Sequence, residues 1–126
     1  MEIIIRNTSG QPIYSQIASQ IKAQILSGEL QPGEALPSIR ALAKDLKISV
    51  ITTKRAYDEL ENAGFLDTVA GKGCFVAEKN LELIRERQMA ELEEHLTAAV
   101  AIAKRNGVSY EQTRDTLRLF WEEEET

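Results

Sequence analysis

Cysteine and histidine are nearly absent, because the 126 residues include one of each, Cys74 and His95. A lone cysteine forms no internal disulfide, which is typical of a protein in a reducing cytoplasm. One isolated histidine supplies neither a Ser/His/Asp set nor a cluster at metal-ligand spacing, and no phosphate-binding glycine loop occurs. The sequence therefore predicts a protein that is not an enzyme and that needs no cofactor or metal.

Long apolar runs are absent as well, so no segment is predicted to span a bilayer. The first residues, MEIIIRNTSGQ, have neither the basic start nor the small-residue cleavage pattern of a secretory signal. Hydrophobic residues make up 43% and charged residues 28%, which is globular rather than disordered composition. We expect a soluble cytoplasmic protein of about one domain with a small appendage.

An excess of positive charge is also missing, since the formal net charge is -5. Most of the acid lies in residues 80–126, which carry eleven acidic and six basic side chains. Residues 36–79 carry seven basic and six acidic side chains. Local charge governs a DNA contact because salt screens charges beyond about 10 Å. The total charge therefore leaves DNA binding by residues 36–79 open, although no strongly basic stripe supports it.

The most informative stretch is residues 36–76, which reads as two short helices joined by a tight turn and followed by a hairpin. Apolar residues at helical spacing predict a helix from Pro37-Ser38 to Leu46. Ser49 is a good N-cap for a second helix that continues to about Gly64. The inward positions of this second helix are Thr53, Ala56, Tyr57 and Leu60, and the outward ones are Ile51, Lys54, Arg55 and Asp58.

Two strand-like segments, residues 65–69 and 74–77, follow this helix and enclose a tight tip. The tip holds Lys72 between Gly71 and Gly73, and both glycines are free to adopt positive φ angles. Each part taken alone is also compatible with an ordinary helical hairpin or a plain turn. In this order they predict a winged helix-turn-helix that binds DNA.

The segment before this stretch is predicted to support it. Residues 2–6 read as a short strand or an extended arm. Pro12 suits the first turn of a helix, and Gly28 suits its end. The apolar positions between them have helical spacing, so one face of this helix should enter the core.

The segment after the hairpin is predicted to form two helices. Residues 81–105 have a long helical pattern, and Ser109 with Gln112 forms a capping box for a last helix. The predicted fold class is therefore mainly α with a small β-wing. Residues 1–78 form the winged helix-turn-helix and residues 79–126 form a dimerisation tail. The apolar side chains expected between two copies of the tail are Leu92, Leu96, Val100, Leu117, Phe120 and Trp121.

The segments LPSIRALAKDLKIS, TTKRAYDELENAGFL and GKGCFV closely resemble the GntR family of bacterial transcription regulators. The resemblance covers residues 12–77. The short helical tail resembles the YtrA-like subfamily. This implies a regulator of transcription, usually a repressor, that binds double-stranded DNA at an inverted repeat as a homodimer. Its location would be the bacterial cytoplasm, in association with the nucleoid when it is bound.

The resemblance also implies which residues contact DNA. Arg40 matches a contact from the second helix, and the recognition helix spans residues 49–64. The wing, residues 70–74, matches the part that enters the minor groove. Helical periodicity adds outward positions of the recognition helix to this set. The candidate DNA-binding residues are Ser38, Arg40, Ser49, Val50, Ile51, Thr52, Lys54, Arg55, Gly71, Lys72 and Gly73.

One position departs from the family pattern. Many members have an arginine directly after the residue equivalent to Ser49, where it can bind guanine through two hydrogen bonds. Val50 and Ile51 occupy this place here. Apolar side chains can contact the methyl group of thymine but cannot pair with guanine. We therefore hypothesise an A·T-rich operator core opposite Ile51.

Two other functions remain open. In the first, a small-molecule effector binds at the dimer interface near His95 or Trp121. In the second, the winged helix binds another protein, which is compatible with the acidic net charge. A metal at His95 would need carboxylates from another helix or subunit.

Overall fold

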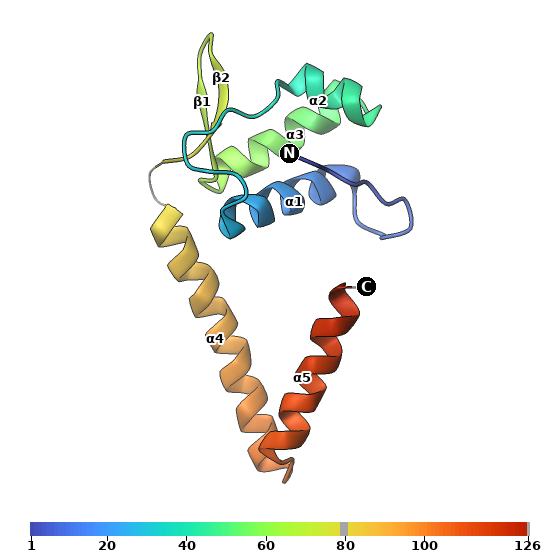
Figure 1. The fold of residues 1–126 in the computed structure, drawn as a ribbon, viewed down its shortest axis with the longest axis vertical. Helices are drawn as coiled ribbons and strands as arrows, with labels where there is room; N and C mark the ends of the chain where they lie inside the picture. Colours follow the sequence, from blue (N-terminus) through green and yellow to red (C-terminus); the bar gives the residue numbers. More distant parts are fainter. Residues whose placement is uncertain (79–80, 126) are drawn as a thin grey trace. The chain divides into compact units, whose positions relative to one another are not determined.

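The computed structural model describes residues 1–78 and 81–125, with side chains up to Glu123. The helices are α1 (Ile13–Ser27), α2 (Ile39–Leu46), α3 (Val50–Asn62), α4 (Leu81–Arg105) and α5 (Tyr110–Glu125), and the strands are β1 (Leu66–Val69) and β2 (Gly73–Val76) (Figure 1). The predicted mainly helical fold with a two-stranded wing is confirmed.

The chain divides into two compact units, Met1–Arg85 and Glu86–Thr126. The sequence places the domain boundary at residue 78, whereas the first turn of α4 belongs to the N-terminal unit. Leu81 and Ile84 explain this difference, since both are buried in the core of that unit. We call residues 86–125 the tail.

The core of the N-terminal unit lies where α1 packs against α3, with α2 on the other side of α3. Apolar residues spaced three or four apart give each helix one inward face, and burial of one such side chain stabilises the fold by about 1.5–3 kcal/mol. The largest fully buried side chains are those of Ile17, Ile21, Ile25, Thr53, Leu60, Leu66 and Val76.

Residues 2–6 form an extended arm along α1 rather than a strand. Three glutamine side chains of α1, one per helical turn, hydrogen-bond the backbone of every second residue of the arm. Two of these amides each bind both an N–H and a C=O group, at distances of 2.6–2.9 Å. The pairs are Gln16 with Arg6, Gln20 with Ile4 and Gln24 with Glu2.

The wing has an additional short pairing that the sequence does not predict. β1 and β2 are antiparallel, in a register that joins Leu66 to Val76. The loop after α1 lies along the other edge of β2. There, the N–H of Gly33 donates to the C=O of Val76 and the N–H of Leu36 donates to the C=O of Cys74, both at 2.9 Å. This loop therefore connects the base of the wing to the start of α2.

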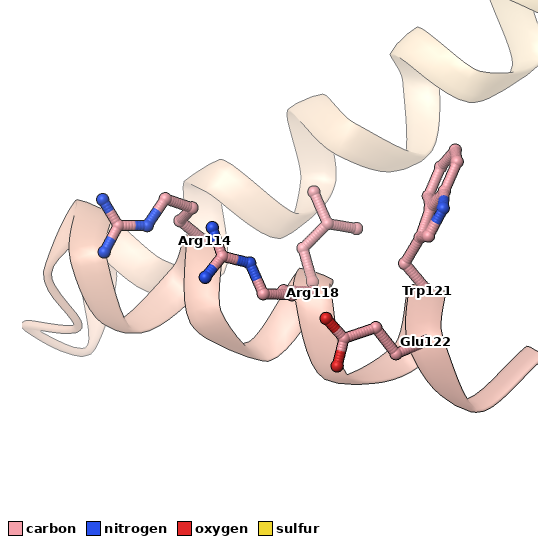
Figure 2. Close-up of a pocket in the computed structure, with 5 residues that line it drawn as sticks. Arg114, Arg118, Trp121 and Glu122 are labelled. Atoms are coloured by element: carbon pink, nitrogen blue, oxygen red, sulfur yellow. The ribbon is translucent and has the colours of Figure 1, made fainter.

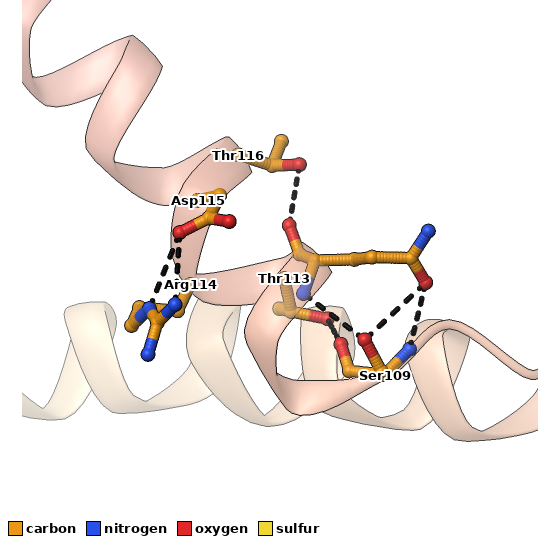
Figure 3. A network of polar contacts seen from close by, with 6 residues as sticks. Ser109, Thr113, Arg114, Asp115 and Thr116 are labelled. Atoms are coloured by element: carbon orange, nitrogen blue, oxygen red, sulfur yellow. Dashed lines mark hydrogen bonds and ion pairs between the residues drawn. The ribbon is translucent and has the colours of Figure 1, made fainter.

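The tail is a helical hairpin without a core of its own. Its last helix begins at the predicted capping box, where Ser109 Oγ accepts a hydrogen bond from the N–H of Gln112 at 3.1 Å (Figure 3). Gln112 Oε1 in turn accepts one from the N–H of Ser109 at 3.1 Å. Among residues 86–123, no side chain is buried, and only Ala103 and Thr113 are half-buried.

Candidate nucleic-acid interface

Two of the predicted DNA-binding serines are helix caps. Ser38 Oγ accepts a hydrogen bond from the N–H of Ala41 at 3.0 Å and begins α2. Ser49 Oγ accepts one from the N–H of Thr52 at 3.0 Å and begins α3. Each cap leaves the positive end of its helix dipole exposed, and this end favours a phosphate group.

The outward face of α3 is apolar at its start. The predicted division of the helix is confirmed, with Thr53, Ala56, Tyr57 and Leu60 buried and the intervening positions exposed. The Ile51 side chain is 82% exposed and that of Val50 is 46% exposed. Thr52 is half-buried at the side of the helix. The first turn of α3 therefore presents hydrocarbon where DNA is expected.

Lys54 is exposed on α3 but is already paired. Its Nζ lies 2.7 Å from Oδ2 of Asp58, one turn further along the helix. The hydrogen bond to this carboxylate, and then its charge, raise the pKa of Lys54 above its ordinary value. Lys54 therefore remains a cation at neutral pH, but Asp58 competes with a phosphate for its Nζ.

Replacement of Asp58 with asparagine is expected to strengthen binding to duplex DNA of any sequence. The change releases Lys54 and removes a negative charge from the exposed side of α3. Because exposed ion pairs are weak and screened by salt, we expect a modest gain of about two- to fivefold, measured by fluorescence anisotropy. Asp115→Asn is the matched control, since Asp115 pairs with Arg114 at 3.1 Å in the tail. An equal gain in both variants would show that net charge alone is responsible.

Arg55 lies at the edge of α3, next to α1. Its guanidinium carbon is 3.8 Å from the centre of the Tyr14 ring, which is a close cation–π contact. The sequence predicts the exposure of Arg55 but does not link it to Tyr14. This contact holds Arg55 toward α1 rather than over the start of α3.

Tyr57 fixes the position of α2 against α3. Its hydroxyl donates a hydrogen bond to the C=O of Pro37 at 2.7 Å. Burial, and to a smaller extent the neighbouring Cys74, raises the pKa of Tyr57, so its hydroxyl keeps the proton that it donates. Tyr57 thereby holds the segment from which Ser38 and Arg40 begin α2.

Two of the predicted cations are unpaired. Within the residues that the structure describes, no hydrogen bond, ion pair or ring contact engages the side chain of Arg40 or that of Lys72. Lys72 lies at the tip of the wing, between Gly71 (φ 76°) and Gly73 (φ 110°). Both cations are exposed, so both are available to a phosphate.

The predicted dimerisation residues lie on the surface of the tail, and their exposed fractions range from 41% to 67%. One open hollow of about 430 Å³ is lined by Arg114, Leu117, Arg118, Trp121 and Glu122 of α5 (Figure 2). An apolar groove of about 420 Å³ lies between α4 and α5 and includes Leu96, Val100 and Leu117.

The described parts of the chain contain neither a cluster of metal ligands nor a membrane-spanning helix. No three His, Cys, Asp or Glu side chains there gather closely enough to hold a metal ion. Among the same residues, no helix has the length and apolar character needed to cross a membrane.

Known proteins are similar to this chain over most of its length. The family described as "Bacterial regulatory proteins, gntR family" matches residues 13–76. The HTH-type transcriptional regulator YhcF of Bacillus subtilis (strain 168) is 37% identical over 114 residues, which cover 90% of this chain and 93% of YhcF. The HTH-type transcriptional repressor YtrA of the same organism is 34% identical over 110 residues, which cover 87% of this chain and 85% of YtrA.

Solved structures show the same fold. A transcriptional antiterminator from Listeria monocytogenes EGD-e has a TM-score of 0.70 and 32% identity, and the match covers 95% of this chain and 90% of that one. The AraR DNA-binding domain in complex with operator ORX1 has a TM-score of 0.54 and 28% identity, with 61% and 96% covered. The predicted resemblance is thus confirmed. The chain belongs to the gntR family of bacterial regulatory proteins, in its YtrA-like subfamily, and is a DNA-binding regulator of transcription.

Proposed function

We propose that this regulator is a homodimeric repressor that binds an inverted-repeat operator. The two α3 helices enter successive major grooves about 34 Å apart, and the wings, residues 70–74, enter the adjacent minor grooves. Binding at a promoter then represses transcription because the dimer and RNA polymerase compete for the same DNA.

The proposal of a homodimer is supported by one observation, the exposed apolar surface of the tail. Between residues 86 and 123 no side chain is buried, although both helices carry leucine, valine and aromatic residues. A soluble monomer rarely exposes so much contiguous hydrocarbon. A second copy offers the same apolar surface, and a two-fold axis pairs these surfaces without leaving an open end.

The roles that we propose at the DNA follow from charge and exposure. Arg40 and Lys72 are free cations and suit phosphate groups, which set the register of the protein on the duplex. The caps Ser38 and Ser49 direct helix N-termini at the DNA backbone. Lys54 and Arg55 add positive charge beside α3.

The experiment that tests this proposal is a gel shift with the DNA upstream of the protein's own gene, together with light scattering. About three phosphate contacts per protomer predict a loss of about 10³-fold in affinity between about 50 and 200 mM salt. Light scattering should give the mass of two chains. Specific binding that is indifferent to salt, or a monomer bound to a single half-site, would contradict the proposal.

A further inference from the structure

We propose that Val50 and Ile51 recognise the 5-methyl group of a pyrimidine in each operator half-site. This inference rests on the proposed function, because it assigns the base that the same α3 face reads. Thymine is the natural ligand of this kind, and 5-methylcytosine carries the same group.

The first argument concerns the hydroxyl groups at the start of α3. Ser49 Oγ caps the N–H of Thr52 and also donates a hydrogen bond to Thr52 Oγ1 at 2.8 Å. The Ser49 proton is therefore used within the helix. Of the two hydroxyl groups, only that of Thr52 keeps a proton to donate to DNA. Thr52 is half-buried at the side of α3, away from its outward face.

The second argument concerns the cations of α3. Lys54 binds Asp58 at 2.7 Å, and the Arg55 guanidinium lies 3.8 Å from the centre of the Tyr14 ring. Neither side chain is directed by a contact toward the first turn of the helix. The commonest specific contact with guanine comes from an arginine or lysine side chain, and the first turn of α3 carries neither.

The third argument is the exposure of Ile51. The Ile51 side chain is 82% exposed, which is the highest exposed fraction of any large hydrophobic side chain in the described part of the chain. The N-terminal residues of a recognition helix are those that reach base edges. The methyl group at C5 of thymine is the apolar feature on the major-groove edges of the bases. Contact between this methyl group and Ile51 removes hydrocarbon of both molecules from water.

The test removes only the methyl group. An operator is selected from random duplexes with the full chain, and each thymine of the half-site is replaced in turn by deoxyuridine, symmetrically in both half-sites. Loss of one buried methyl group corresponds to about fourfold in affinity per half-site, or about fifteenfold for the dimer. We expect this loss at one or two thymines of each half-site, measured by fluorescence anisotropy.

Two variants assign the effect to Ile51, and a methylated operator tests it on the wild-type chain. The Ile51→Ala variant should lose most of the preference for the thymine operator over the uracil operator, because only Val50 then remains to contact the methyl group. The matched control is Ile4→Ala, which removes an isoleucine that is 54% exposed on the arm and should keep the preference for thymine. When the sensitive T·A pair is replaced by C·G, methylation of that cytosine at C5 should strengthen wild-type binding by about fourfold per half-site.

The outcomes separate this inference from the proposed function. If a specific, salt-sensitive operator is found but every thymine tolerates uracil, the inference is wrong and the proposed function stands. An invariant guanine opposite Ile51 would also overturn the inference. If selection yields no operator, both fail. The uracil comparison uses the wild-type chain, so its result does not depend on the folding of any variant.

Discussion

Replacement of Leu96 with glutamate is expected to make the protein monomeric and to lower its operator affinity by about 100-fold or more. Leu96 is 41% exposed and lines the apolar groove of the tail beside Val100 and Leu117. A carboxylate there would lose its water in the proposed dimer without gaining a partner. A monomer binds a single half-site. It therefore loses the gain in affinity of about 10²–10⁴ that comes from linking two binding modules. Light scattering and a gel shift measure the two effects.

The matched control for this substitution is Leu119→Glu. Leu119 is 67% exposed on α5, at a helical position opposite Leu117, so the same charge is placed away from the expected interface. Circular dichroism shows whether each variant keeps its helices. If Leu96→Glu remains a dimer with wild-type affinity, the proposed interface is wrong.

Replacement of Arg40 with alanine is expected to weaken operator binding by about tenfold or more and to leave the fold and the dimer unchanged. Arg40 is exposed, and its side chain has no intramolecular partner among the described residues, so its loss costs the N-terminal unit little. A charge-assisted hydrogen bond to phosphate is worth about 1.5–3 kcal/mol. Loss of one contact per protomer should also lower the slope of log affinity against log salt by about two.

The variant Arg40→Lys serves as the control for charge alone. Lysine keeps the positive charge but lacks the planar fork of arginine, so it should restore the salt slope and only part of the affinity. Thermal unfolding of all three proteins checks stability. Unchanged affinity in Arg40→Ala would show that the family role does not apply to this residue.

Local signals in the sequence were sufficient for most of the fold. The cap Ser49, the helix end at Gly28 and the capping box at Ser109 each act within about four residues, so spacing alone reveals them. The same holds for the two faces of α3. The helical pattern of residues 81–105 also matches the observed bounds of α4, Leu81–Arg105.

Contacts between distant segments were not predictable in this way. Tyr57 binds the C=O of Pro37, twenty positions earlier, and Arg55 stacks on Tyr14 of another helix. No local pattern specifies such pairs, because they depend on how helices pack. The pair of Lys54 with Asp58 differs, since residues four apart on a helix are neighbours and this spacing is visible in the sequence.

The glutamine contacts along α1 join a helical repeat to an extended repeat of nearly the same length. Four residues of helix advance about 6.0 Å, whereas two residues of extended chain advance about 6.6 Å, so the two repeats nearly match but drift apart. Arg6 and Ile4 each form both bonds, but Glu2 forms one. Gln24 Oε1 is buried without a hydrogen-bond partner in the described structure. One face of a helix can therefore take the place of a neighbouring strand, with glutamine amides replacing the backbone N–H and C=O groups that such a strand would offer.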